Sequence, residues 1–222
     1  HVVVNGRRQR ANVEAVAKEI ERQGVGSLVV MADVADPAAV ADMAAQAKAK
    51  FGTVDIAVSN VSVRLKQPFL DLSVEDWRRT LDSNLSSCFY LARAVIPDMK
   101  SQGHGRLIHI SGIDGFTGHV ADRAHNIVAK AGMHALAKAL STEFGRFGIT
   151  ANTVAPGAID TTRDWSQYGD PAEWIAQRKK TIPVGRIGTV DEIAAACVYL
   201  ASDHAGFVTG QVIHVNGGAA MY

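Results

Sequence analysis

The sequence predicts one α/β domain with a mostly parallel central sheet covered by helices on both faces. Short apolar runs rich in β-branched residues and without polar alternation recur along the chain, as in strands that are buried on both faces. Stretches with apolar residues at helical spacing separate these runs, and parallel neighbouring strands need such crossover connections. Because 222 residues with no inter-domain linker fit one domain, we treat 1–222 as a single unit.

The elements alternate regularly along the chain. In the first half, strands are expected at 1–5, 27–34 and 54–60, and helices at 8–23, 37–51 and 73–100. Gly24 ends the first helical pattern, Pro37 starts the second helix, and Ser73 with Asp76 three residues later indicates the start of the third. In the second half, strands are expected at 106–111, 149–156 and 211–216, and helices at 122–147, 171–180 and 189–201. An irregular segment fills 157–170.

Composition excludes several classes of protein. Lysine and arginine (23) balance aspartate and glutamate (22) and are scattered, so a nucleic-acid partner is not expected. Cys88 and Cys197 lie in apolar helical patterns without metal-ligand spacing, which indicates small core residues and no metal site. Because no apolar segment approaches the roughly 18 residues of a membrane span and no leader pattern is visible, we expect a soluble cytoplasmic protein.

Several short motifs stand in a characteristic order. They are DV at 33–34, VSN ending at Asn60, WRRTLDSNLSSCF around Asn84, AKAG at 129–132, ITANTVAPGAIDT at 149–161, and the later stretches PVGRIGTVDEIAAACVYLAS and GFVTGQVIHVNGG. In this order they resemble the short-chain dehydrogenase/reductase family, including its 3-oxoacyl reductases, over essentially the whole chain. The resemblance implies a Rossmann-like three-layer αβα sandwich that binds NAD or NADP. It also implies a homotetramer or homodimer formed through 73–100, 122–147 and the C-terminal strand.

The resemblance also assigns a cofactor site. Asp33 and Val34 would face the adenine ring, although Asp33 alone also reads as a turn cap. Asn60 would tie neighbouring loops, in a segment where the family's usual Asn-Asn-Ala-Gly is Ser-Asn-Val-Ser. The segment 156–161 would lie beside the nicotinamide. Pro156 and Gly157 would form the turn that leads into it, although simple turn chemistry also explains these two residues. Ile159 would pack on the nicotinamide ring, and Thr161 would form a hydrogen bond with its carboxamide.

Charge at the end of the second family strand favours NADP over NAD. An enzyme that prefers NAD places a carboxylate there, whereas a 2′-phosphate requires cations. This corner reads Asn5-Gly6-Arg7-Arg8, and Arg7 is the better candidate for the phosphate. The alternative is that Arg7 is an ordinary exposed residue at a helix start.

The family's first strand and its glycine-rich phosphate loop should precede His1. A sheet without its central first strand exposes two unpaired edges, which is unfavourable. We therefore expect the natural chain to have roughly 30 or more further N-terminal residues, the size of a strand, a loop and part of a helix. The alternative is a true truncation that cannot hold a pyrophosphate.

The catalytic positions are only partly retained. Family members usually combine Asn, Ser, Tyr and Lys, with Tyr as the proton donor four residues before Lys on one helix. Lys130 and Asn84 match the Lys and the Asn. Asn126 stands at the Tyr position, and an amide cannot replace a phenol as proton donor. Gly112 stands at the Ser position, so that only a bulge would bring Ser111 into the pocket.

Other groups near this stretch could supply a proton. They are Asp114, His119, Asp122 and His125, each with an ordinary structural explanation, while His109 is expected to be buried in a strand. The family's variable substrate lid contains Arg163, Trp165 and Tyr168. Trp165 and Tyr168 are expected to give an aromatic surface and Arg163 to meet a substrate carboxylate. The alternative is that all three side chains only face solvent.

Three functions remain open at this point. The first is an NADP(H)-dependent oxidoreductase that acts on a small carbonyl or hydroxyl compound with a non-standard proton donor. The second is a non-redox lyase, isomerase or decarboxylase on the same fold, in which Asn126, Ser111 and backbone N–H groups polarise an oxygen. The third is a nucleotide-binding protein without turnover.

Overall fold

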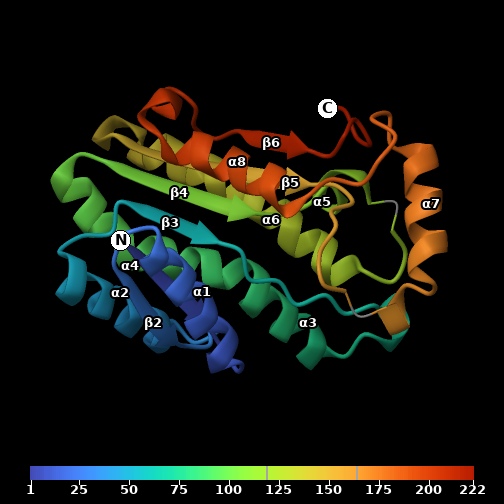
Figure 1. Ribbon diagram of the computed structural model, residues 1–222, viewed down its shortest axis with the longest axis horizontal. Coiled ribbons are helices and arrows are strands. Elements are labelled where there is room, and N and C mark those ends of the chain that lie inside the picture. The colour runs from blue at the N-terminus through green and yellow to red at the C-terminus, as the bar shows by residue number, and fades with distance from the viewer. Residues whose placement is uncertain (119, 164) are drawn as a thin grey trace.

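All paired strands are parallel, and they form two groups (Figure 1). In this computed structural model, which describes residues 1–118, 120–163 and 165–222, β1 (Val2–Gly6) pairs with β2 (Ser27–Met31). The second sheet contains β3 (Ile56–Ser59), β4 (Gly105–Ile110), β5 (Ile149–Pro156) and β6 (Val212–Val215), in that spatial order. The prediction of a parallel α/β fold is confirmed.

The helices also follow the predicted order. Their bounds are α1 (Arg10–Arg22), α2 (Pro37–Phe51), α3 (Val74–Leu81), α4 (Ser87–Gln102), α5 (Asp114–Thr117), α6 (Ala124–Phe144), α7 (Pro171–Thr181) and α8 (Val190–Ala201). The predicted 73–100 stretch is divided by a π-helical turn at Asp82–Ser86, and α5 was not predicted because four residues carry no periodicity. Across the described residues, none of the helices combines the length and apolar character needed to cross a bilayer.

Local sequence sets several helix starts. The Ser73 hydroxyl accepts a hydrogen bond from the Asp76 N–H at 3.0 Å, as the sequence predicted for the start of α3. Thr189 and Glu192 form a reciprocal capping box at the start of α8. These caps satisfy N–H groups that have no partner inside the helix.

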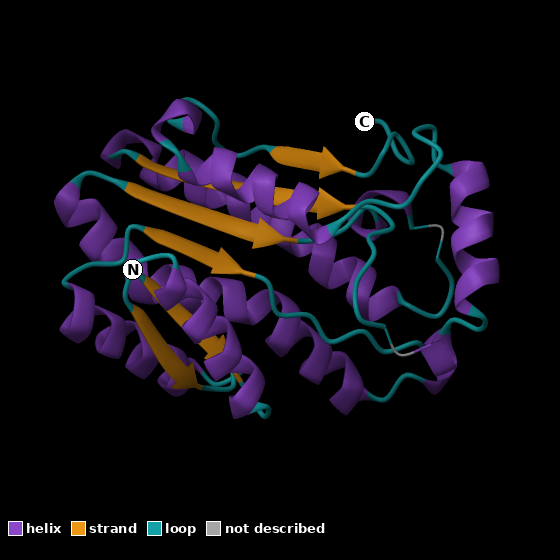
Figure 2. Cartoon of the chain, in the orientation of Figure 1, coloured by secondary structure: helices purple, strands orange, loops and turns teal. Residues whose placement is uncertain are grey.

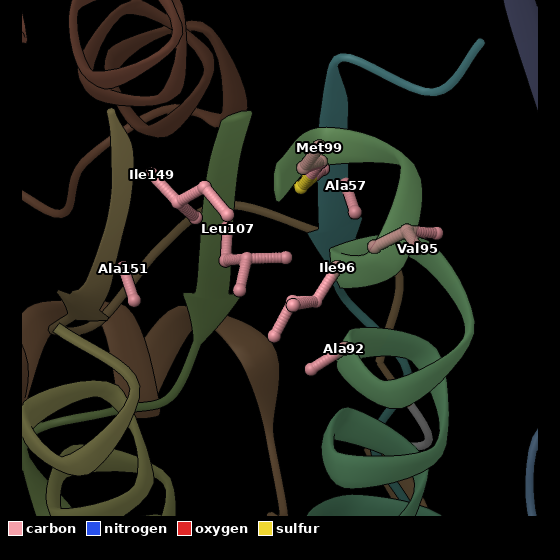
Figure 3. Packing of buried hydrophobic residues seen from close by; sticks show 8 residues of the cluster. All are labelled: Ala57, Ala92, Val95, Ile96, Met99, Leu107, Ile149 and Ala151. Carbon is pink, nitrogen blue, oxygen red and sulfur yellow. The ribbon is translucent and has the colours of Figure 1, made fainter. Parts of the chain in front are cut away.

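Helices cover both faces of the four-stranded sheet (Figure 2). On one face, α4 packs its Ala92, Val95, Ile96 and Met99 against β3, β4 and β5 through Ala57, Leu107, Ile149 and Ala151 (Figure 3). On the other face, α8 packs through Leu200 on Ile108 and Val154. A third cluster joins β2 to α2 through Val30, Val40 and Met43. The sheet is thereby held between two helical layers, with its strand ends free to form a site.

The sheet is interrupted between β1 and β3. Within the described residues, no strand pairs with the edge of β1 or of β3 that faces this gap. The prediction that β1 is buried on both faces is wrong for Val2, which is 41% exposed. On β3, Ile56 and Val58 are 45% and 46% exposed, whereas Ala57 between them is buried against α4.

Candidate functional site

A cavity of about 720 Å³ opens at the carboxyl ends of β3, β4 and β5. Ligands of parallel α/β folds bind at this edge of the sheet. The predicted site residues that line the cavity are Asn60, Ser111, Asn126, Lys130, Pro156, Gly157, Ile159 and Thr161. The fold therefore brings together residues from 60 to 161 that the sequence placed in one pocket. Arg7, Asp33 and Val34 do not line it.

Asn84 lies in the π-helical turn between α3 and α4, a feature that often marks functional sites. Its side chain is fully buried. The Asn84 Oδ1 accepts from the Val63 N–H at 2.6 Å, and its Nδ2 donates to the Val63 C=O at 2.9 Å. Because a backbone N–H only donates and a carbonyl only accepts, these bonds assign the two ends of the Asn84 amide. Asn84 thus holds the loop that follows β3.

The sequence analysis gave that loop-tying role to Asn60. In the structure Asn60 is exposed at the cavity, and its side chain makes no hydrogen bond within the described part of the chain. The tie to the loop comes instead from Asn84, which reaches it from the helical layer. Sequence spacing could not show this, because Asn84 lies on a helical segment 21 residues after Val63 and meets the loop only in the folded chain.

Asn126, which the sequence analysis matched to the family's tyrosine, contacts Asn84. The Asn84 Nδ2 donates to the Asn126 Oδ1 at 3.4 Å, a long hydrogen bond. Since Val63 fixes the orientation of Asn84, this contact leaves the Asn126 Nδ2 as the end available to other partners. Asn126 is 2% exposed and lines the cavity. It therefore offers N–H donors, and no acidic proton, to a bound molecule.

Lys130 lies one turn after Asn126 on α6 and is 4% exposed. Its Nζ donates a hydrogen bond to the Ile110 C=O at 2.9 Å, where β4 ends. Burial, and secondarily the positive charge of Arg64, lowers the pKa of this ammonium group to about 8. In its charged form such a group can donate hydrogen bonds to the oxygen atoms of a ligand. Because its pKa is close to neutral, it can also give up or take up a proton near pH 7.

Ser111 lines the cavity, but its hydroxyl is engaged elsewhere. Its Oγ lies 2.7 Å from His134 Nε2 and 3.3 Å from the Val154 C=O. Burial lowers the pKa of His134 to about 4, so this imidazole is neutral at pH 7. Ser111 reaches the cavity wall, which the sequence analysis expected only if the chain bulged there, and its hydroxyl contacts His134. The sequence analysis missed His134, although its place one turn after Lys130 on α6 was a signal that could have found it.

Gly112, at the family's serine position, leaves space in the wall. A Cβ built there would have the Pro156 carbonyl oxygen, at 3.9 Å, as its nearest contact. The position therefore has room for a side chain, and the absence of a hydroxyl is a property of this sequence rather than a demand of the packing.

The end of β5 forms the opposite wall. The Gly157 N–H donates to the Val215 C=O at 3.0 Å, and a Cβ at Gly157 would lie 2.8 Å from the Asn216 Cα. Because two backbone segments meet so closely, only glycine fits here. Ile159 pairs with Gly188 in an isolated parallel bridge and turns to the cavity.

Arg7 and Asp33 form a second cluster at the ends of β1 and β2. The Arg7 Nη1 lies 3.2 Å from the Asp33 Oδ2, and both side chains are 43% exposed. Asp33 Oδ1 also accepts from the Ala35 N–H at 3.1 Å, so Asp33 caps a turn as the alternative interpretation proposed. Val34 follows directly and packs against the β2 and α2 core. This pair is accessible to a ligand but is separate from the cavity.

The other predicted proton donors are distributed unevenly. Asp114 lines the cavity and lies 3.7 Å from the Arg123 guanidinium. His125 is fully buried and is not part of the cavity wall, and burial lowers its pKa. Asp122 is also absent from the wall, and His119 lies outside the described residues. His109 is buried in β4, as expected, with its pKa lowered to about 4 by burial.

Aromatic side chains from 165–168 and from α7 lie together beside the cavity, and two of them, Tyr168 and Trp174, line its wall. Trp165, Tyr168 and Trp174 pack edge to face with one another. The Arg163 guanidinium lies 4.3 Å from the centroid of the Trp174 ring, and Tyr168 OH accepts from Arg123 Nη2 at 2.9 Å.

Groups of three or more metal-ligating side chains are absent from the described residues.

These features define a class of protein: a parallel α/β fold whose strand ends and adjoining helix, α6, enclose one ligand cavity. Comparison with known proteins identifies the family within that class. A family model described as enoyl-(acyl carrier protein) reductase matches residues 1–220. The chain belongs to the short-chain dehydrogenase/reductase family, and it is an oxidoreductase of that type.

Three similar proteins indicate the range of the family. The 3-oxoacyl-[acyl-carrier-protein] reductase FabG of Escherichia coli (strain K12) is 36% identical over 208 residues, covering 94% of this chain and 82% of that protein. The 2,3-dihydroxy-2,3-dihydro-p-cumate dehydrogenase of Pseudomonas putida is 41% identical over 173 residues, covering 78% and 66%. The structure of a gluconate 5-dehydrogenase from Burkholderia cenocepacia J2315, in complex with NADP and tartrate, has a TM-score of 0.89 at 30% identity, covering 98% and 84%.

Proposed function

We propose that this chain is an NADP(H)-dependent oxidoreductase that acts on a small carbonyl or hydroxyl compound, with a proton donor other than tyrosine. The observation that carries the proposal is the position of Asn126 and Lys130 on the same cavity as the Pro156–Thr161 segment. The similar proteins named as a reductase and as dehydrogenases support a redox reaction. The neighbour that holds NADP supports the choice of cofactor.

The described residues fit both ends of a dinucleotide. At the nicotinamide end, the close backbone approach at Gly157 keeps the β5 turn against β6, and the cavity of about 720 Å³ stays open beside it. Ile159 would pack on the ring and Thr161 would bond its carboxamide, while Lys130 would hold the ribose. At the other end, Asp33 and Val34 would contact the adenine ring and Arg7 would bind the 2′-phosphate.

The cofactor, when bound, supplies or removes the hydride at the substrate carbon. The Asn126 Nδ2 would donate a hydrogen bond to the substrate oxygen and polarise it. Lys130, with a pKa of about 8, would give a proton to that oxygen as a carbonyl is reduced and would then be reprotonated from solvent. Asn84 holds Asn126 and the Val63 loop in place. Ser111, whose hydroxyl contacts His134, would support the wall of the site.

The direct test is to mix the full-length protein with NADPH and a panel of small carbonyl compounds. Loss of nicotinamide absorbance is expected for at least one of them. Cofactor binding without consumption across the whole panel would count heavily against a reductase and would favour a non-redox enzyme or a binding protein.

Substitution of Arg7 tests the choice of cofactor. Arg7→Ala is expected to raise the KM for NADPH about tenfold and leave the KM for NADH nearly unchanged, because a charge-assisted hydrogen bond to phosphate contributes about 1.5–3 kcal/mol. Steady-state kinetics with each cofactor measure this. Arg10→Ala, three residues later at the start of α1 and likewise in an exposed ion pair, with Glu14, is the matched control. Equal effects on both cofactors would contradict the assignment.

We also infer a homo-oligomer formed through the stretches 73–100 and 122–147 and the C-terminal strand. Phe89 on α4 and Val128 on α6 are 47% and 44% exposed, which leaves an apolar surface on both helices. Phe89→Asp is expected to lower the molecular mass measured by light scattering. Val16→Asp, at an equally exposed apolar position on α1, should leave the mass unchanged. An unaltered mass in the Phe89 variant would place the interface elsewhere.

A further inference from the structure

The cavity wall is strongly cationic. Six basic side chains line it: Arg64, Lys66, Arg123, Lys130, Arg163 and Arg178. Among the lining residues that the structure describes, Asp114 is the only acid. The chain as a whole carries a formal charge of only +1, with 23 basic residues. About a quarter of its positive charge is therefore gathered around one cavity.

Most of these cations have no carboxylate partner among the residues that the structure describes. Within 1–118, 120–163 and 165–222, no ion pair involves Arg64, Lys66, Arg163 or Arg178, and Arg123 lies 3.7 Å from Asp114. Elsewhere, some exposed arginines are paired, such as Arg22 with Glu19 at 2.6 Å and Arg186 with Glu192 at 2.6 Å, whereas Arg8 and Arg93 have no ion pair among the described residues but do not line this cavity with its other cations. Unpaired like charges at one site repel each other, which is unfavourable unless an anion binds there.

Several of the guanidinium groups are held in position. Arg163 Nη2 donates to the Ile159 C=O at 2.6 Å, and its guanidinium lies 4.3 Å from the Trp174 ring centroid. Arg178 lies 5.3 Å from the same ring, so Trp174 positions two cations. Burial lowers the pKa of Arg163, and the charges of Arg64 and Arg178 lower it further. Ordered donors bind an anion with less loss of side-chain entropy than flexible ones.

The aromatic side chains beside these cations define the rest of the site. Tyr168 and Trp174 line the same cavity. The Ile159 carbonyl, in the segment proposed to contact the nicotinamide, accepts a hydrogen bond from Arg163. A substrate with its reacting carbon near Lys130 would meet the aromatic wall along its body. Its far end would meet the arginines at the exposed rim.

Resting on the proposed function, we infer that the substrate is a small organic anion, with a carboxylate or phosphate group bound by Arg163, Arg178 and Arg64. Guanidinium groups recognise both kinds of anion through paired N–H donors. The neutral reacting carbon would then lie toward Lys130 and Asn126, so that the arginines set which molecules enter in the correct orientation.

Calorimetric titration of the cofactor-free protein with three probes tests this inference. Tartrate carries carboxylates, glycerol 3-phosphate carries a phosphate, and threitol is the neutral counterpart of tartrate. Tartrate or glycerol 3-phosphate is expected to bind at least tenfold more tightly than threitol, and the comparison of the two shows which anion is preferred. Arg178→Gln is expected to weaken binding of the preferred anion about tenfold, the value for loss of one charge-assisted hydrogen bond.

Lys179→Gln is the matched control. The substitution removes the same charge from the next residue of α7, and Lys179 does not line the cavity. It should leave the dissociation constants unchanged. Equal binding of threitol and the anions, absence of anion binding, or equal weakening by both variants would overturn the inference. NADPH consumption with neutral carbonyl compounds alone would also overturn it while leaving the proposed function standing. Anion binding without any NADPH consumption would instead remove the proposed function alone.

Discussion

Lys130→Met is expected to lower kcat/KM for NADPH-dependent carbonyl reduction by about 10²- to 10⁴-fold, the usual contribution of a positioned general acid. It is also expected to raise the free energy of unfolding at pH 7. Lys130 is 4% exposed, and its pKa falls from 10.5 to about 8 mainly through burial. Methionine fills similar space without the cost of burying a charge.

The magnitude follows from linkage between protonation and folding. A pKa lowered by roughly 2.5 units corresponds to an upper limit of about 3 kcal/mol of destabilisation by the charged form at neutral pH. The variant also loses the hydrogen bond from the charged ammonium to the Ile110 carbonyl, which costs about 1.5–3 kcal/mol. We therefore expect a net gain of up to about 1 kcal/mol in the variant at pH 7, measured by urea denaturation.

The pH dependence gives an independent check of the sign. Between pH 8 and about 10.5 the unfolded chain holds the Lys130 proton and the folded chain does not, so the stability of the wild type rises with pH in this window relative to Lys130→Met. The advantage of the variant should shrink across it. Lys138→Met, at an exposed position two turns later on α6, controls for helix propensity. A variant that is less stable at pH 7, or fully active, would contradict the role given to Lys130.

Introducing the serine and tyrosine that the sequence analysis matched to positions 112 and 126 should have the opposite effect on the reaction. The double variant Gly112→Ser with Asn126→Tyr should raise the rate of carbonyl reduction by about 10²- to 10⁴-fold, because a phenol beside Lys130 is a better-positioned acid than the present arrangement. The wall at Gly112 has room for the serine, with its nearest contact at 3.9 Å. Position 126 precedes Lys130 by one helical turn, so both side chains face the same way.

The control for this experiment is Gly112→Ser with Asn126→Phe, which adds a ring of the same size without the hydroxyl. It should show no gain in rate. NADPH consumption by the three proteins on the same carbonyl panel measures the effect. A fall in an existing rate in the tyrosine variant would show that Asn126 carries part of the present reaction. A gain in rate would thus indicate a reductase that lacks an efficient proton donor, and a fall would indicate a reductase whose mechanism depends on Asn126.

Much of the fold was accessible from local sequence. The β5 strand has the predicted bounds of 149–156, and α2 has the predicted bounds of 37–51, since apolar runs and a proline at the helix start act within a few residues. The π-helical turn at Asn84 was not predicted, because it interrupts a continuous helical pattern without a change in composition. The incomplete burial of β1 was also missed, because the exposure of a strand depends on which distant elements cover it.

The sequence by itself determined the order of strands and helices, and it predicted that Asn84 and Lys130 match the family's Asn and Lys and that Asn126 stands at the position of the tyrosine. Each of these depends on residue identity and spacing along one element. Only the tertiary structure decided that the Ser111 hydroxyl contacts His134, that Val63 orients Asn84, and that Arg64, Arg163 and Arg178 surround one cavity. These residues come from segments far apart in the chain. Parallel strands bring their loops to one edge, and the charge that gathers there is visible only once the sheet is assembled.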